Sequence, residues 1–327
     1  MKTGNMPENV LKRSVLKRIK PDDEIVLRGA AVGADCAFLR INPQDICAMA
    51  HGSAIMEKED SMAHAIYRAT NNLAAGGAKP MAIQVGLMMP KACVEHQLKM
   101  IMSQAQKTAE ELGVTIAGGN TQIHPAIKEP VVNITALGIP YKENVWKKPK
   151  IRIGQDIVMS KWIGISATAY LAKQYEKDLC TRYPVNYIKD AQSLEQYYSI
   201  IPEAATAIRS GVSAMHDVSG CGIFGALWEL GEYAGVGLTI SLKKIPVKQE
   251  TIEICEFFDL NPYKMRSDGA LLMVTEDGLA LVEALEKEGI PAAVIGTITA
   301  GNDKVVVNDE EKRFLEPPYS DEWYKVI

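Results

Sequence analysis

The sequence has no run of eighteen apolar residues, and its first twenty residues contain no uninterrupted apolar segment. A membrane-spanning helix and a secretion signal both need such segments, so we expect neither and place the protein in the cytoplasm. The chain also has no excess of basic residues: it contains 36 Lys and Arg and 40 Asp and Glu, which gives a net charge of -4. General nucleic-acid binders carry a strong basic surplus. The composition therefore argues against nucleic acid and membranes as partners and favours a small-molecule ligand.

Paired cysteines are absent as well. The six cysteines form no C-x-x-C pair and no cluster with metal-ligand spacing. Scattered thiols are typical of reduced cysteines in the cytoplasm and argue against structural zinc. Cys221 directly precedes a predicted helix, where the dipole lowers a thiol pKa, so a reactive thiolate is one interpretation and an inert thiol the other. The cysteines are Cys36, Cys47, Cys93, Cys180, Cys221 and Cys255.

The chain does have enough apolar sequence for two hydrophobic cores, since 47% of its 327 residues are hydrophobic and 23% are charged. Periodicity predicts alternating strands and helices, and the charged, proline-containing segment 142–150 predicts a linker. We therefore predict an α+β protein with domains over residues 1–150 and 151–327. Strands are expected at 36–41, 45–50, 81–88, 114–117, 131–137, 156–160, 238–241, 270–274 and finally 293–298, and helices at 61–75, 92–112, 165–174, 193–209, 223–234, 248–258 and 277–288.

The stretch 215–223 has the pattern of a buried strand end, a polar glycine-rich turn and the start of a helix. Backbone N–H groups at a helix N-terminus, together with the helix dipole, favour an anion such as phosphate. Asp217 fits a metal ligand or a group that orients His216 as a general base. The alternative for this carboxylate is helix capping. Two further glycine turns are predicted, 33–37 before a strand and 116–121 at the end of one.

The order of these motifs resembles the superfamily of aminoimidazole ribonucleotide synthetase, hydrogenase maturation protein HypE, thiamine monophosphate kinase and selenophosphate synthetase. HypE is the most similar member. Each motif is permissive by itself, but six in matching order make the resemblance specific, and it spans nearly the whole chain. The segments are 33–37 (G-D-D-A-A in the family), 71–80 (N-D-x-A-x-x-G-A-x-P), 118–121 (G-G-[DE]-T), 154–158 (the opening strand of the second domain), 216–222 (D-x-[ST]-x-G-G) and 267–272 (N-E-G-x-L).

The resemblance implies a two-domain PurM-like fold, in which the mixed sheets of two N-terminal domains pair into the β-barrel of a homodimer. It implies ATP with magnesium held by carboxylates, and an enzyme or maturation factor that activates an oxygen of a small substrate or carrier group by phosphorylation. A small-molecule substrate or a maturation protein is the further partner. The residues that we assign are Asp35 and Asp217 to metal, His216 and Asp217 to catalysis, and Asp35, Asn71, Asn72, Gly118, Gly119, Asn120, Thr121, Ser219, Gly220 and Gly222 to the nucleotide.

The sequence departs from the family pattern at the acids that would hold magnesium. Ala34, Asn72 and Asn120 occupy positions of family carboxylates, and a fourth loss falls at His51 or Gly52. A carboxamide keeps the shape of a carboxylate but loses the negative charge of a strong magnesium ligand. The alternative function is therefore a non-catalytic nucleotide- or metabolite-binding relative, and a third is a structural partner that binds no nucleotide.

Two further features bear on the chemistry. Glu57, Glu59 and Asp60 lie in a polar loop and are candidate replacements for the missing carboxylates. The resemblance to HypE implies a reactive cysteine at the extreme C-terminus, whereas residues 321–327 contain no thiol. We therefore expect that this chain does not perform the thiol-based step of HypE in that way.

Overall fold

The computed structural model describes residues 6–42, 44–56, 61–145, 147 and 149–326. The chain divides into two compact units. The N-terminal unit consists of Pro21–Gly29 and Asp35–Lys147, and the C-terminal unit consists of Met1–Lys20, Ala30–Ala34 and Lys148–Ile327. Each unit has its own sheet and helices, which confirms the expected two-domain α+β class. Among the described residues, no helix is both long and apolar enough to cross a membrane.

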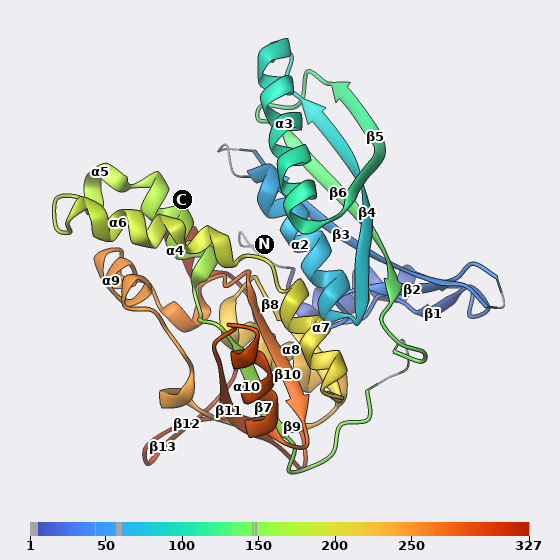
Figure 1. The fold of residues 1–327 in the computed structure, drawn as a ribbon, viewed down its shortest axis with the longest axis vertical. Coiled ribbons are helices and arrows are strands. Elements are labelled where there is room, and N and C mark those ends of the chain that lie inside the picture. Colours follow the sequence, from blue (N-terminus) through green and yellow to red (C-terminus); the bar gives the residue numbers. More distant parts are fainter. Residues whose placement is uncertain (1–5, 43, 57–60, 146, 148, 327) are drawn as a thin grey trace. The chain divides into compact units, whose positions relative to one another are not determined.

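The N-terminal unit is built on a six-stranded mixed sheet with the order β1-β2-β3-β6-β4-β5. Helix α2 packs against β3, β6 and β4, while α3 packs against α2 and β5 (Figure 1). Helix α2 has the bounds that the sequence predicted, 61–75. The elements are β1 (Val26–Arg28), β2 (Ala37–Arg40), β3 (Ile46–Ile55), α2 (Ser61–Ala75), β4 (Ala78–Met89), α3 (Glu95–Leu112), β5 (Thr115–Ile123) and β6 (Val131–Pro140).

One face of this sheet forms the core of the unit. Along β3 and β6 every second residue is buried, and Met62, Ile66 and Leu73 of α2 are fully buried. The close approach of helix to sheet requires Gly52, because a Cβ there would lie 2.4 Å from the carbonyl oxygen of Ala65. The opposite face carries the alternate residues of β3, among them the exposed Ile55. The unit thus leaves a sheet face uncovered by its own helices.

The segment 118–121 is not a turn, as its two glycines suggested, but the middle of the edge strand β5. This strand runs parallel to β4, with a register shift where Ile83 and Gln84 pair with Ile116 and Gly118. Glycine is required here by close backbone packing: a Cβ on Gly119 would lie 1.9 Å from the carbonyl oxygen of Val85. The pair of glycines therefore marks a strand irregularity, which glycine serves as often as it serves a turn.

The C-terminal unit is built on a seven-stranded sheet with the order β13-β12-β9-β11-β7-β10-β8. Helix α8 contacts β8, β9 and β12, whereas α10 contacts β7, β10 and β11 (Figure 1). The main elements are α1 (Glu8–Ser14), β7 (Asp156–Ser160), α4 (Ile165–Gln174), α6 (Val185–Gln192), α7 (Ile201–Arg209), β8 (Ala214–Val218), α8 (Gly222–Ala234), β9 (Gly237–Ser241), α9 (Gln249–Phe257), β10 (Ala270–Thr275), α10 (Gly278–Lys287), β11 (Ala292–Thr299), β12 (Lys304–Asn308) and β13 (Glu311–Phe314).

The prediction that the fold ends with a strand at 293–298 is wrong, because β12 and β13 extend the sheet as an antiparallel hairpin after it. The start of the chain also belongs to this unit. Helix α1 lies against α8, where the Trp228 indole nitrogen donates to a Glu8 carboxylate oxygen at 3.0 Å. Lys12 forms an ion pair of 3.0 Å with Glu232 of the same helix. These contacts involve residues more than two hundred positions apart, so no local pattern predicts them.

Candidate functional site

In the N-terminal unit the structure gathers several predicted residues at the C-terminal end of α2. Asn71 and Asn72 lie in the last turns of that helix, and Asp35 lies just before β2. The two segments touch, because a Cβ on Gly76 would lie only 2.2 Å from the Cys36 sulfur. Asp35 is therefore brought beside the helix end that carries both asparagines.

Arg28, which sequence reasoning missed, ties this cluster together. Its Nη2 donates to the carbonyl oxygen of Gly76 at 2.8 Å and to the Cys36 sulfur at 3.2 Å. Its guanidinium carbon lies 4.4 Å from the ring centre of Phe38, the residue opposite it in the β1–β2 pair. The only sequence signal was an isolated arginine in a short apolar strand, which is not distinctive.

The second group of predicted residues in this unit lies elsewhere. Gly118, Gly119, Asn120 and Thr121 are on the edge strand β5, and β3, β6 and β4 separate that strand from β2. Four inter-strand spacings correspond to roughly 19 Å. A single N-terminal unit therefore does not bring Asp35 and the β5 residues around one phosphate group.

In the C-terminal unit, the turn 219–222 joins β8 to α8 as predicted. Ser267 connects it to two neighbouring loops: its backbone N–H donates to the Ser219 carbonyl at 3.1 Å, and its hydroxyl accepts from the Gly164 N–H at 2.7 Å. Gly222 has φ +63°, and a Cβ there would lie 2.5 Å from the carbonyl oxygen of Met265. The glycine spacing is therefore required by tight loop packing at the start of the helix.

An internal carboxylate occupies part of the predicted anion site. Asp321 accepts the backbone N–H of Cys221 at 2.8 Å, and it also accepts the N–H groups of Arg266 and Trp323 at 3.2 Å. Burial raises the pKa of this carboxyl group, while the Arg266 charge and the three N–H donors act in the opposite direction. The distance in sequence explains why the motif did not reveal Asp321: the acid that meets the turn lies 100 residues later.

His216 and Asp217 do not form the pair that their adjacency suggested. His216 is opposite Leu272 in the β8–β10 pair and Asp217 is opposite Leu271, and neighbouring strand residues point to opposite faces. Leu272 belongs to the core cluster that includes α8, and His216 Nε2 lies 3.2 Å from Glu229 of that helix. The Asp217 side chain is on the other face, so it does not orient the His216 imidazole.

Of the two interpretations of Cys221, the structure favours the inert thiol. Burial, together with the charges of Asp321 and Glu229, raises the pKa of this thiol to about 12. At pH 8 a thiol with that pKa is ionised to roughly one part in ten thousand. We therefore expect Cys221, with the buried Cys36 and Cys255, to resist iodoacetamide in the native protein while the half-buried Cys180 is alkylated. Peptide mass spectrometry checks this, with urea-unfolded protein as the control; rapid native labelling of Cys221 would contradict it.

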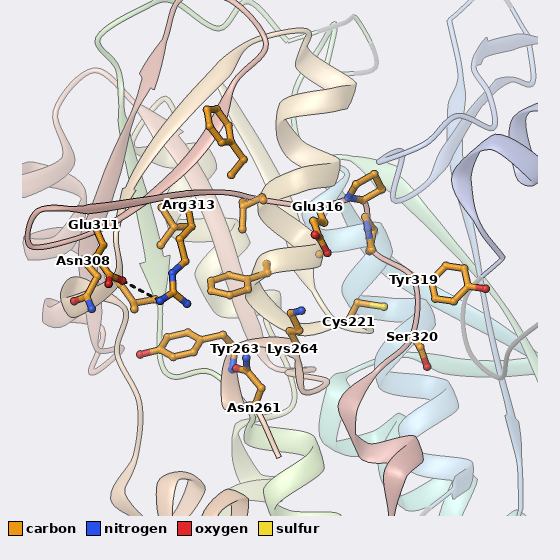
Figure 2. A pocket seen from close by; sticks show the side chains of 18 residues that line it. Cys221, Asn261, Tyr263, Lys264, Asn308, Glu311, Arg313, Glu316, Tyr319 and Ser320 are labelled. Atoms are coloured by element: carbon orange, nitrogen blue, oxygen red, sulfur yellow. Dashed lines mark hydrogen bonds and ion pairs between the residues drawn. The ribbon is translucent and has the colours of Figure 1, made fainter. Parts of the chain in front are cut away.

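A pocket of about 500 Å³ lies beside the α8 N-terminus (Figure 2). Its apolar part includes Phe224 and Tyr263, whose rings stack at 5.3 Å with an angle of 10° between their planes. Lys264 and Glu316 add charges of both signs, and Arg313 is paired with Glu311 at 2.9 Å. The C-terminal segment that leads to Asp321 forms part of its lining. The pocket is of ligand size but shows no strong preference for one sign of charge.

Magnesium needs several hard oxygen ligands, which Asp and Glu side chains provide. Asp35 and Asp217, the two acids that we assigned to metal from the sequence, belong to different units. Within the described ranges, no group of three or more His, Cys, Asp or Glu residues is arranged to hold a metal ion. Glu57, Glu59 and Asp60, the candidate replacements, lie outside the residues that the structure describes. Among the described residues, the donor set of neither unit fits a magnesium centre, because this ion requires several hard oxygen ligands.

Two family models match the sequence and together cover most of it. One is the N-terminal domain of AIR synthase related protein, over residues 18–140, and the other is the C-terminal domain of the same family, over 152–308. The chain belongs to the AIR synthase related protein family. This match confirms the resemblance drawn from the six motifs.

This AIR synthase related protein is 24% identical to a protein of Methanocaldococcus jannaschii named as a hydrogenase expression/formation protein, over 97% of this chain and 95% of the relative. It is 25% identical to carbamoyl dehydratase HypE of Azotobacter vinelandii, over 74% and 70% of the two chains. The first similarity extends over practically the full length of both proteins.

Solved structures of the superfamily share the fold. A HypE–HypF complex matches with a TM-score of 0.76 and 18% identity, over 94% of this chain and 99% of the other. HypE in complex with ATP matches with a TM-score of 0.73 and 17% identity, over 95% and 94%. Thiamine monophosphate kinase of Aquifex aeolicus matches with a TM-score of 0.64 and 17% identity, over 82% and 88%. These likenesses confirm the two-domain PurM-like fold.

Proposed function

We propose that this AIR synthase related protein is an ATP-dependent enzyme or maturation factor that activates an oxygen of a small substrate or carrier group by phosphorylation. The observation that carries the proposal is the likeness of both units to HypE, whose structure has been solved in complex with ATP. Each unit by itself offers candidate contacts: the end of α2 with Asp35, Asn71 and Asn72 in the N-terminal unit, and the turn 219–222 in the C-terminal unit. Asp217 and His216 remain proposed catalytic residues, as separate groups on opposite faces of β8 and not as a pair. The six free cysteines support a reducing compartment, for which we propose the cytoplasm.

A homodimer is part of this proposal. Four strand spacings, roughly 19 Å, separate the β5 residues from β2, so a second copy that supplies one of the two groups would let Asp35 and β5 contact the same phosphate. The uncovered face of the sheet supports pairing with a second sheet, because exposed apolar residues such as Ile55 and Met81 favour burial. A maturation protein is a further proposed partner, by analogy with the HypE–HypF complex.

Magnesium is the part of the family chemistry that the described residues do not fit. The absence of carboxylates at Ala34, Asn72 and Asn120 favours a second candidate function, a non-catalytic relative that binds a nucleotide or another metabolite. The two candidates share ligand binding and differ in turnover.

Calorimetry and phosphate release test the proposal. We expect the purified protein to bind ATP with a Kd in the micromolar to millimolar range, roughly -8 to -4 kcal/mol. Release of γ-phosphate in the presence of candidate acceptors distinguishes the enzyme from the binding relative. Binding without any release would favour the second candidate, and a flat calorimetric trace with ATP would contradict both. Serum albumin at the same concentration controls for the heat of ATP dilution and for weak binding of the anion to protein.

A further inference from the structure

Arg28 places a fixed positive charge in the part of the N-terminal unit where the resemblance implies a metal ion. It is at the end of β1, with its guanidinium above the buried Phe38 ring and 2.8 Å from the carbonyl oxygen of Gly76. The same nitrogen lies 3.2 Å from the sulfur of Cys36, the residue directly after Asp35. The guanidinium therefore lies between the β1–β2 hairpin and the end of α2.

The charges around this point disfavour a divalent cation. Among the described residues that we assigned to the ligand in this unit, Asp35 is the single carboxylate near the end of α2, since Asn71 and Asn72 are neutral. The Arg28 charge lowers the pKa of the Cys36 thiol and the Asp35 charge raises it, so both charges lie near the same sulfur. A guanidinium beside one carboxylate offsets its negative charge and repels a metal ion, whereas it attracts a phosphate.

The side chain is also held in a way that leaves donors for a ligand. Contacts to Gly76 and Cys36 use the two hydrogens of Nη2, and Nε is enclosed by protein. A guanidinium has five N–H donors in a plane, so the hydrogens of Nη1 remain to donate to phosphate oxygens. Because Arg28 is half-buried, contact with such an oxygen needs no withdrawal of the whole side chain from solvent.

We infer that Arg28 neutralises a bound polyphosphate in place of a divalent cation, so that this protein takes metal-free ATP or a related polyphosphate anion. The inference rests on the proposed nucleotide site at the end of α2. It assigns a binding role to a residue outside every motif of the family resemblance. In a purely structural role, Arg28 would only cap the carbonyl groups at the end of α2. Its loss would then affect folding but not the metal dependence of polyphosphate binding.

The experiment measures ATP and tripolyphosphate binding by calorimetry, once in EDTA and once with excess magnesium. Wild-type protein is expected to bind more tightly in EDTA than with excess magnesium, because magnesium removes the metal-free anion and its charge is repelled by Arg28. Arg28→Met is expected to weaken metal-free binding tenfold or more, as for the loss of a charged hydrogen bond. Arg40→Met, which removes an exposed arginine from the neighbouring strand β2, is the matched control and should bind as wild type.

Folding of each variant is checked by circular dichroism and thermal melting. If Arg28→Met does not fold, Arg28→Lys keeps the charge but loses the fork, and its metal-free binding should fall between wild type and zero. Binding that appears only with magnesium, or folded Arg28→Met that binds like wild type, overturns the inference but leaves the proposed function intact. If wild-type protein binds ATP under neither condition, the proposed function itself fails.

Discussion

Glu203→Ala is expected to lower the free energy of unfolding by about 3–5 kcal/mol, because it leaves a buried ammonium group without its carboxylate. Lys161 and Glu203 are 5% and 2% exposed, and their charged atoms lie 2.5 Å apart. The Lys161 ammonium also donates to the carbonyl oxygens of Tyr197 and Ser199 at 2.8 and 2.7 Å. Urea denaturation followed by circular dichroism measures the change.

The double variant Lys161→Met/Glu203→Met separates the charge effect from packing. It should lower the free energy of unfolding by less than Glu203→Ala alone does, since it leaves neither charge unpaired. Glu256→Ala, which breaks a pair with Arg182 on the surface of the same unit, is the control and should cost no more than about 1 kcal/mol. A Glu203→Ala loss as small as that of Glu256→Ala would show that the Lys161 charge is compensated by other groups.

The same lysine predicts a pH dependence. Burial is the main cause that lowers the pKa of Lys161 from its ordinary value of 10.5, against the opposing effects of Glu203 and Asp217. Between the lowered pKa and 10.5 the unfolded chain therefore binds more protons than the folded one. The contribution of Lys161 to the free energy of unfolding thus rises with pH across that window and is smallest below it.

Gly119→Ala is expected to lower the free energy of unfolding by about 3 kcal/mol. It should also separate the edge strand β5 from β4, because the added Cβ would lie 1.9 Å from a backbone carbonyl oxygen of β4. A flexible side chain could move aside, but the Val85 carbonyl is fixed in the sheet. Hydrogen exchange of the amides in 115–123 measures the release, and light scattering measures whether a dimer is lost with it.

Gly86→Ala is the matched control for this prediction. It lies on β4 next to Val85, and a Cβ there would meet Asn133 at 3.5 Å, an ordinary contact distance. We expect unchanged exchange in β5 for this variant. Fast exchange in both variants would mean that the β4–β5 pair tolerates a side chain neither at Gly86 of β4 nor at Gly119 of β5. Slow exchange in both would mean that the strands adjust to Gly119→Ala.

Much of the fold could be predicted from the sequence, since local hydrophobic periodicity determines where regular elements form. The helix at 61–75 and the strand at 156–160 have the predicted bounds. The pair Gly118 and Gly119 misled the prediction, because a glycine suits a turn and a close strand contact equally well and the partner strand is distant in sequence. Strands β12 and β13 were missed because they are short and follow a polar turn.

The candidate site was predicted only in part, for the same reason. The β8–α8 turn has a local glycine pattern, and the structure places it at the start of a helix as expected. Asp321, which accepts the Cys221 N–H, and Arg28, which joins Cys36 to the end of α2, belong to no motif. Their roles depend on contacts between segments distant in the chain, and such contacts carry no periodic signal.

The sequence by itself determined the family and the α+β class, because these follow from residue types and their order. Tertiary structure alone decided the electrostatics: Asp217 and His216 face opposite sides of a sheet, and a guanidinium lies beside the segment of Asp35. Residue order fixes which groups a chain carries. Their effect on a ligand depends on distance and burial, which only the packing of the folded chain determines.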